Sequence, residues 1–315
     1  MINRRSVRVK TMQALYAFQS SDTQSTNDFE QYLIKSIQSV KEQYLFILLY
    51  IREIANYVEQ DAHIKAKKYI QTEKDKQFST KLLSNTFVQY LNHNEEFQNE
   101  IKKSNTQLLI NVDEVRKFYK KFSETAAYKS YLQNESEFNI DEDQKIIAFL
   151  FNNVLLEDEH FLEIIEEFFI NWNDDALLVV DAVREAIKKS KNELALHIGK
   201  QNVKSKIDEL TKFGKDLFFN VVHKKEEYIG LIEPKLKNWE TDRLAMLDVL
   251  ILRMALSEFI DFPSIPVKVT MNEYLDIARE YSTSKSKDFI NGVLDKIMQE
   301  LKAKNQLNKT GRGLL

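Results

Sequence analysis

The stretch Asp261–Ile297, DFPSIPVKVTMNEYLDIAREYSTSKSKDFINGVLDKI, decides the fold of this chain. Pro263 and Pro266 lie between two apolar patterns, so one helix ends before them and another begins after them. Apolar residues recur at helical spacing over 267–281, which predicts a helix there. After a polar loop, Asp288 is a candidate cap for a last helix over 289–302.

Helical patterns extend upstream from this stretch. Residues 239–259 are apolar nearly all round, which predicts a helix in the centre of a core. A single apolar stripe over 29–69 predicts one long amphipathic helix. Shorter helices are expected over 82–91, 112–132 and 176–200, the last ending near Gly199.

The composition agrees with these patterns. The chain has 315 residues, of which 43% are hydrophobic and 30% charged, with 6 glycines and 3 prolines. Because Gly and Pro are the residues that interrupt helices, their scarcity predicts an all-α protein. The length is sufficient for two domains.

Several classes of function are disfavoured. The chain has no Cys, and its five His residues show no metal-ligand spacing. It lacks the Gly-rich phosphate-binding motifs and the nucleophile elbow, so we expect no cofactor and no enzymatic activity. The longest apolar runs, such as 44–51, are too short to span a bilayer, so we expect a cytoplasmic protein that does not associate with membranes.

The N-terminus is a basic arm in front of an amphipathic helical pattern. Its cations lie within seven residues: Arg4, Arg5, Arg8 and Lys10. The net charge is −3, so the whole molecule is not polyanion-binding, but a local patch of this kind can bind phosphate groups. The alternative is a charged terminus that is simply solvated.

Ordered blocks of sequence resemble one family. The N-terminal RRSVRVKTMQALY, the later LRMALSEF, the prolines, Asn272-Glu273 and FINGVLDKI resemble the transcription antitermination factor NusB at compatible spacing. They also resemble the NusB-like domain attached to some RNA cytosine methyltransferases. Those enzymes need a separate cofactor-binding domain with Gly-rich turns, and the presence of only six glycines argues against such a domain here. The resemblance implies an all-α, NusB-like helical bundle. It also implies boxA-type RNA, the ribosomal protein NusE and the transcription elongation complex as partners in rRNA transcription.

The resemblance also implies roles for individual residues. Tyr16 and Glu258 fall on positions expected to face NusE, although a half-buried Tyr and a solvent-facing Glu are the plainer alternatives. The expected RNA-binding residues are Arg4, Arg5, Arg8, Lys10, Arg279, Lys285, Lys287 and Phe289. Lys285 stands where the family often has an acidic residue, and Phe289 could instead belong to the core.

The domain organisation departs from the usual family length. We expect the basic arm and first helix in 1–20, a helical insert in 21–204, the main NusB-like bundle in 205–303 and a disordered tail in 304–315. Aromatic residues at 118, 119, 122, 128 and 131 in the insert could stack on bases, but their helical spacing favours a core. If the insert has taken over the main role, the protein is a helical protein–protein scaffold.

The insert contains a candidate repeat. Residues 150–181 align without gaps on 217–248, with identities that include both tryptophans, Trp172 and Trp239. Such self-similarity suggests that the insert carries a degenerate, partial repeat of the bundle. The alternative is a chance match between unrelated amphipathic helices.

Overall fold

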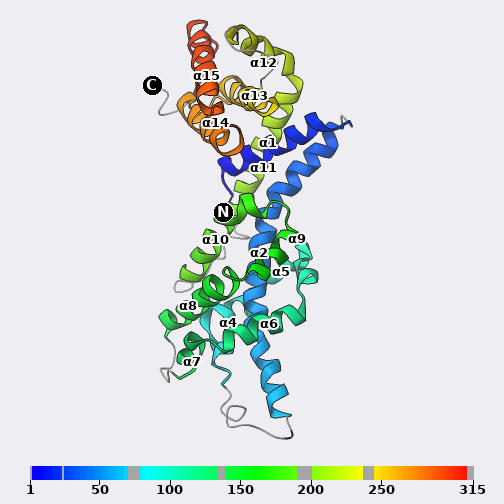
Figure 1. Cartoon of the computed structure of the whole chain (residues 1–315), viewed down its shortest axis with the longest axis vertical. Coiled ribbons are helices and arrows are strands. Elements are labelled where there is room, and N and C mark those ends of the chain that lie inside the picture. The colour runs from blue at the N-terminus through cyan, green and yellow to red at the C-terminus, as the bar shows by residue number, and fades with distance from the viewer. Residues whose placement is uncertain are drawn as a thin grey trace. The chain divides into compact units, whose positions relative to one another are not determined.

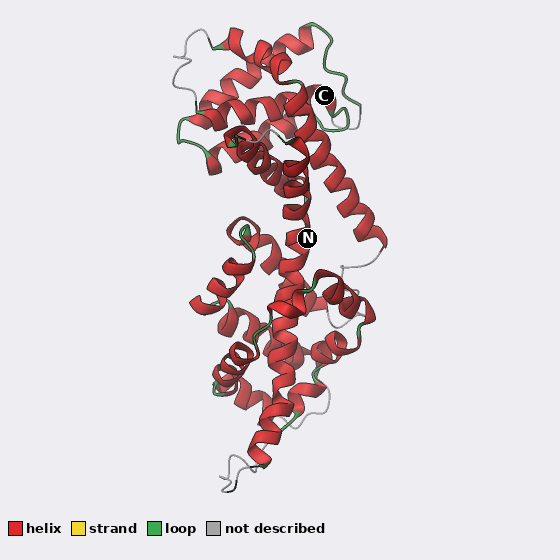
Figure 2. Ribbon diagram, turned by 90° about the vertical axis from the view of Figure 1, so that its right-hand side faces the viewer, coloured by secondary structure: helices red, strands yellow, loops and turns green. Residues whose placement is uncertain are grey.

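The computed structural model describes residues 2–22, 25–67, 69, 79–133, 139–189, 201–236 and 245–310. Nearly all of these residues are helical and none is in a strand (Figures 1 and 2). The predicted all-α class is therefore confirmed. Among the described helices, none is long and apolar enough to cross a membrane. The same residues contain no cluster of acidic and His side chains that could hold a metal ion.

The chain forms two compact units, here called unit 1 and unit 2. Unit 1 comprises residues 38–206, and unit 2 comprises residues 2–37 and 207–315. The long helix α2 (Thr26–Ala66) contributes its first turns to unit 2 and the remainder to unit 1.

Unit 2 is built around α13 (Met246–Asp261), in which every residue from Leu250 to Phe259 is buried. Helices α1 (Arg4–Ser20), α12 (Lys225–Ile232), α14 (Val267–Tyr281) and α15 (Ser286–Ala303) pack against it. The expectation of a central apolar helix is confirmed, although residues 237–244 lie outside the described part. The unit is completed by α11 (Gln201–His223) and the short η4 (Glu233–Lys235).

The two prolines separate α13 from α14 as predicted. Pro266 occupies the extended position directly before α14, where its fixed φ and missing N–H are tolerated. The last helix, however, begins at Ser286 rather than Phe289, so Asp288 lies in its first turn and is not its cap. The carboxylate of Asp248 on α13 accepts hydrogen bonds from the hydroxyls of Ser282 and Ser286 and so holds the α14–α15 turn against α13.

A glycine lets α11 approach α1 closely. A Cβ at Gly214 would lie 2.8 Å from Cγ1 of Val7 and 3.4 Å from Cδ1 of Ile37. In a helix interior Gly costs about 1 kcal/mol relative to Ala. This close approach explains why the chain tolerates that cost here.

The stretch after α15 makes contacts as far as it is described, up to Thr310. The amine of Lys309 donates to the carbonyl oxygens of Glu258, at 2.7 Å, and Phe262, at 3.0 Å. The backbone N–H of Thr310 donates to Pro263. The segment 304–315, expected to be disordered from its polar composition, therefore contains Lys309, a cation that binds carbonyl oxygens near the end of α13. Residues 311–315 lie outside the described part.

Unit 1 surrounds the apolar stripe of α2, where every residue from Tyr44 to Ile51 is buried. Its remaining elements are η1 (Lys81–Ser84), α4 (Thr86–His93), α5 (Glu95–Ser104), η2 (Thr106–Leu109), α6 (Val112–Ser123), α7 (Ala126–Gln133), α8 (Ile140–Phe149), η3 (Leu150–Leu155), α9 (Glu159–Phe168) and α10 (Trp172–Lys189). The five aromatic residues of 118–131 are buried, so they belong to the core and offer no stacking surface.

The two aligned segments of the proposed repeat agree in part. The alignment that places Leu217 on Leu150 also places Glu226 on Glu159, the first residue of α9. Helix α12 begins at Lys225, one residue before that equivalent position. Four aligned pairs are buried on both sides: Leu150/Leu217, Phe151/Phe218, Val154/Val221 and Ile165/Ile232. The third helices differ, since Asp181 is exposed whereas Asp248 is buried. Trp239 lies outside the described residues, so the repeat stays a hypothesis supported by its first two helices.

Candidate nucleic-acid interface

The first helix begins with cations where most helices prefer acids. Oδ1 of Asn3 accepts from the backbone N–H of Ser6 at 2.9 Å and from its hydroxyl at 3.2 Å, which caps α1 and starts it at Arg4. No acidic residue lies in the first turn. Since the positive end of the helix dipole opposes each nearby cation by about 0.3–1 kcal/mol, this arrangement favours an anionic partner.

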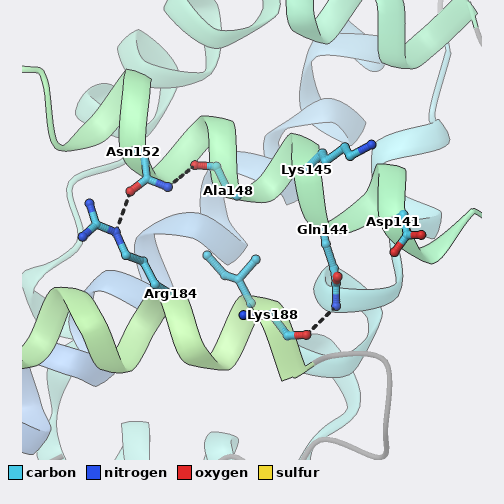
Figure 3. Close-up of a pocket in the computed structure, with 8 residues that line it drawn as sticks. Asp141, Gln144, Lys145, Ala148, Asn152, Arg184 and Lys188 are labelled. Carbon is cyan, nitrogen blue, oxygen red and sulfur yellow. Dashed lines mark hydrogen bonds between the residues drawn. The ribbon is translucent and has the colours of Figure 1, made fainter.

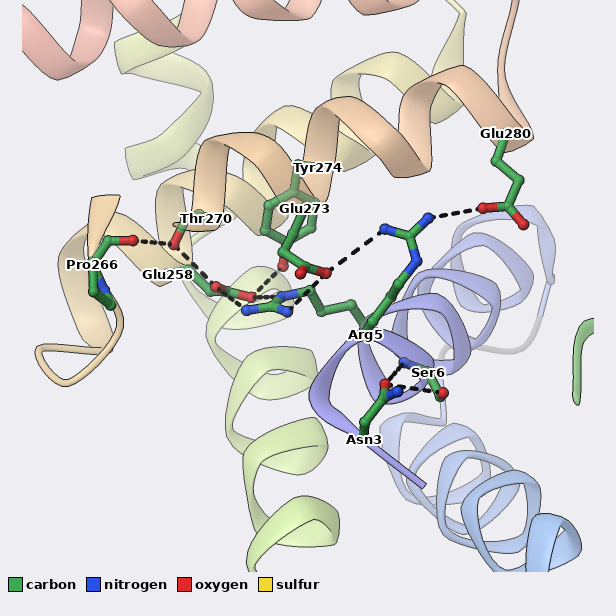
Figure 4. Close-up of polar contacts among 10 residues, drawn as sticks. Asn3, Arg5, Ser6, Glu258, Pro266, Thr270, Glu273, Tyr274 and Glu280 are labelled. Atoms are coloured by element: carbon green, nitrogen blue, oxygen red, sulfur yellow. Dashed lines mark hydrogen bonds and ion pairs between the residues drawn. The ribbon is translucent and has the colours of Figure 1, made fainter. Parts of the chain in front are cut away.

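Arg4 and Arg5 lie on the surface. The Arg4 side chain is 44% exposed and binds Glu209 of α11 at 3.0 Å. The Arg5 side chain is 34% exposed and binds Glu280 at 2.9 Å, with Glu273 3.7 Å away (Figure 4). Exposed ion pairs of this kind contribute little to stability, so an incoming phosphate could displace either carboxylate at small cost.

Arg8 has a different role from the one expected. Its side chain is 3% exposed, and its Nε and Nη2 donate to the two carboxylate oxygens of Glu258 at 2.6 and 2.9 Å. Glu273 lies 3.2 Å from Nη1 on the other side. The prediction that Arg8 is on an RNA-binding surface is therefore corrected: one turn after Arg4 and Arg5, the helix faces inward and the guanidinium is used inside unit 2.

Glu258 is likewise buried, with no exposed surface, so it is not a surface contact for a protein partner in this structure. Besides Arg8, it accepts from the Tyr274 hydroxyl at 2.8 Å and from the Thr270 hydroxyl at 3.1 Å (Figure 4). The network joins α1, α13 and α14. A buried carboxylate requires such partners, because desolvation without them costs several kcal/mol.

The charges in this network reinforce one another. Burial by itself lowers the pKa of Arg8, but the hydrogen bonds and negative charge of Glu258 outweigh it and raise that pKa above its ordinary value. Burial, together with the charge of Glu258, raises the pKa of the Tyr274 hydroxyl well above its ordinary value. Arg8 thus stays charged and Tyr274 stays protonated, and both continue to donate to Glu258.

Two more of the predicted RNA-binding residues are buried. Lys10 is 1% exposed, and Phe289 is 5% exposed at the inner side of α15. Phe289 therefore belongs to the core, the alternative that its position in an apolar helix allowed. The sequence grouped Lys10 with the cations of the arm and did not show that it would lie on the buried side of the helix.

The cations around the α14–α15 turn are accessible. Lys285 is exposed and directly precedes α15, and Lys287 is half-buried in the first turn of that helix. Neither lysine forms an ion pair with a described residue. Arg279 is 65% exposed and pairs with Asp276, 3.1 Å away on the same helix.

The structure brings the two basic segments together. Arg5 of α1 reaches Glu280 in the last turn of α14, and Lys285 and Lys287 follow that turn closely in the chain. Sequence reasoning found these cations but missed Asp248, Ser282 and Ser286, whose hydrogen bonds hold the turn. Glu273 and Glu280 were visible in the sequence, but their pairing with Arg5 of α1 required the fold.

Tyr16 lies apart from these cations, near the C-terminal end of α1. It is 44% exposed, which is a large fraction for a Tyr on an otherwise packed helix. Of the two residues expected to face a protein partner, Tyr16 is therefore available at the surface and Glu258 is not.

Comparisons with known proteins identify the family. The NusB family model matches residues 175–299, from α10 to α15. The chain is similar to the transcription antitermination proteins NusB of Salinibacter ruber (43% identical over 103 residues, 33% of this chain and 64% of the relative) and Chloroherpeton thalassium (38% over 105 residues, 32% and 50%). It is also similar to that of Koribacter versatilis (42% over 99 residues, 31% and 68%).

The matched part spans 64% and 50% of the first two relatives' own length. No solved structure matches the chain. The match to the Koribacter versatilis protein extends over 68% of that relative at 42% identity. On this basis the chain belongs to the NusB family.

Proposed function

We propose that this protein is a transcription antitermination factor that binds boxA-type RNA together with NusE and supports rRNA transcription. The proposal is supported by the similar proteins, which are named as transcription antitermination proteins. The protein would act as a binding protein, without catalysis or cofactor, on the transcription elongation complex in the cytoplasm.

The observation that carries the RNA part is the Arg5–Glu280 pair. It places the basic start of α1 beside the turn that presents Lys285 and Lys287. Cations from two segments that meet at this pair offer a surface that a phosphate backbone can follow. The proposed RNA-binding residues are thus Arg4, Arg5, Lys285 and Lys287, with Arg279 at the edge.

The protein part of the proposal rests on Tyr16. Its exposed ring and hydroxyl offer apolar area and a hydrogen bond to a partner such as NusE. Glu258 would contribute indirectly, by holding α1 against α13 and α14 through Arg8.

The test measures binding of a boxA-type RNA to the full chain, with and without NusE, over a range of salt concentrations. Two phosphate contacts to single-stranded RNA contribute about 1.4 to the slope of log K against log salt. Arg4→Ala/Arg5→Ala should lower the slope by about that amount. Lys225→Ala/Lys302→Ala, which removes two exposed cations elsewhere in unit 2, should leave it unchanged.

A scaffold without specific RNA binding would behave differently. Its RNA affinity would be equally weak in both double variants, and NusE would not increase it. Binding of NusE that depends on Tyr16 but is indifferent to RNA would favour the scaffold.

A further inference from the structure

Unit 1 contains a basic pocket that the proposed antitermination surface does not use. It is a cavity of about 230 Å³ between α8, η3 and α10, all within unit 1 (Figure 3). Its floor is apolar and includes Ala148 and the buried Ile187. Its rim carries three cations, Lys145, Arg184 and Lys188, against one carboxylate, Asp141.

The walls of the pocket are held by hydrogen bonds. Asn152 donates to the carbonyl oxygen of Ala148 at 2.8 Å and accepts from Nε of Arg184 at 2.9 Å (Figure 3). Gln144 donates to the carbonyl oxygen of Lys188 at 2.9 Å, which ties α8 to the C-terminal part of α10. The pocket is therefore a built feature of the α8–α10 packing and does not depend on the positions of surface side chains alone.

Asn152, which binds Arg184, lies in the π-helical η3. The wider turn of η3 interrupts the regular helix directly after α8, and such π-helical turns are frequent at functional sites. In this turn the amide oxygen of Asn152 accepts from Nε of the Arg184 guanidinium. With Nε held, the remaining nitrogens of the guanidinium can still donate, and the nearest carboxylate, that of Asp181, is 3.7 Å from Nη1.

The lysines of the rim are not neutralised by their neighbours. Lys145 and Lys188 make no ion pair with any residue in the described part of the chain. Their positive charges cost nothing while they are solvated, but they favour any anion that enters the pocket. An apolar floor with a basic rim suits a ligand that has a flat apolar part and an anionic group.

We propose that this pocket binds one nucleotide, with its base on Ala148 and Ile187 and its phosphate between Arg184 and the two lysines. The cavity volume of about 230 Å³ accommodates the base, so the phosphate of the nucleotide would lie at the basic rim. The phosphate suits Arg184, whose planar fork donates to two oxygens at once. The site is separate from the surface of unit 2 and does not depend on its function.

The test uses the full chain, isotopically labelled for NMR or immobilised for binding. The probes are a free mononucleotide (UMP or AMP), a short single-stranded oligouridylate and an oligoglutamate peptide. The variant Lys145→Glu/Lys188→Glu reverses the rim charge. Its control, Arg116→Glu/Lys120→Glu, makes the same charge change at exposed residues of α6 outside the pocket. Ala148→Leu fills the cavity without altering charge.

Binding to a nucleotide probe should weaken about tenfold or more in the rim variant and in Ala148→Leu, but not in the control. Loss for the oligonucleotide alone would identify an RNA strand as the source of the nucleotide, and loss for the mononucleotide alone would identify a free nucleotide. The proposal is overturned if neither nucleotide binds, if the control weakens binding equally, or if only the acidic peptide depends on the pocket.

Discussion

Replacement of Arg8 by Met should strongly destabilise unit 2. Arg8 is 3% exposed and Glu258 is fully buried, and two of the four hydrogen bonds to that carboxylate come from Arg8. Met retains most of the apolar stem but leaves the Glu258 charge without its main partner. Removal of one member of a buried pair costs about 3–5 kcal/mol. With a urea m value of about 2 kcal/mol/M, the midpoint should fall by about 2 M.

The assay is urea unfolding of the full chain, followed by circular dichroism and by hydrogen exchange of peptides from α1, α13 and α14. The exchange measurement is needed because two units can unfold in separate transitions. Arg4→Met is the matched control: Arg4 is 44% exposed in a single ion pair, and its loss should cost less than about 1 kcal/mol.

A double-mutant cycle tests the cause of the effect. Glu258→Gln keeps one acceptor oxygen, for either Thr270 or Tyr274, but removes the charge that Arg8 neutralises. Arg8→Met should therefore cost about 1–3 kcal/mol less in the Glu258→Gln background than in the native chain. Equal costs in both backgrounds, or a cost for Arg8→Met no larger than for Arg4→Met, would refute the buried-pair reasoning.

Three further predictions concern other contacts. Gly214→Ala should lower the free energy of unfolding by about 1–3 kcal/mol despite the better helix propensity of Ala, because its Cβ would lie 2.8 Å from Cγ1 of Val7. A lower urea midpoint that is restored by Val7→Ala would support this reasoning, and a higher midpoint would contradict it. The hydrogen bond from His160 to Glu114 raises the His160 pKa, so its stabilisation is present below the ordinary value of 6.5 and is lost as pH rises through the folded-state pKa. His160→Gln should remove that part of the pH dependence of unfolding, and an unchanged profile would exclude it. Glu280→Gln should release Arg5 and raise RNA affinity about two- to fivefold. The control Glu226→Gln, at an exposed site on α12, should raise RNA affinity less. Equal increases would indicate that the change in net charge alone is responsible.

Local sequence determined most of the secondary structure of unit 2. The Pro263–Pro266 pair, the apolar residues of 250–259 and the helical spacing of 267–281 each depend on neighbours within one or two turns. Such short-range rules fixed the helix class and the order of elements. They failed at the start of α15, because the turn before it is held by Asp248 from another helix.

The candidate site was only partly visible in the sequence. Charge identified the cations of the N-terminal arm and of the α14–α15 turn, and helical periodicity favoured a core role for the aromatic residues of 118–131. Four residues expected at an interface proved to be buried: Arg8, Lys10, Glu258 and Phe289. A charged residue looks the same in sequence whether it meets water, a ligand or an opposite charge inside the protein.

The sequence by itself determined that this chain is helical, that it carries the family's ordered motifs and which segments are basic. Only the tertiary structure decided which of those charges remain at the surface. Arg5 and Arg8 lie on one helix, three residues apart, yet one meets Glu280 at the surface and the other meets Glu258 in the core. The reason is that burial of an ionic group depends on a partner distant in sequence, and the fold alone brings that partner within hydrogen-bonding distance.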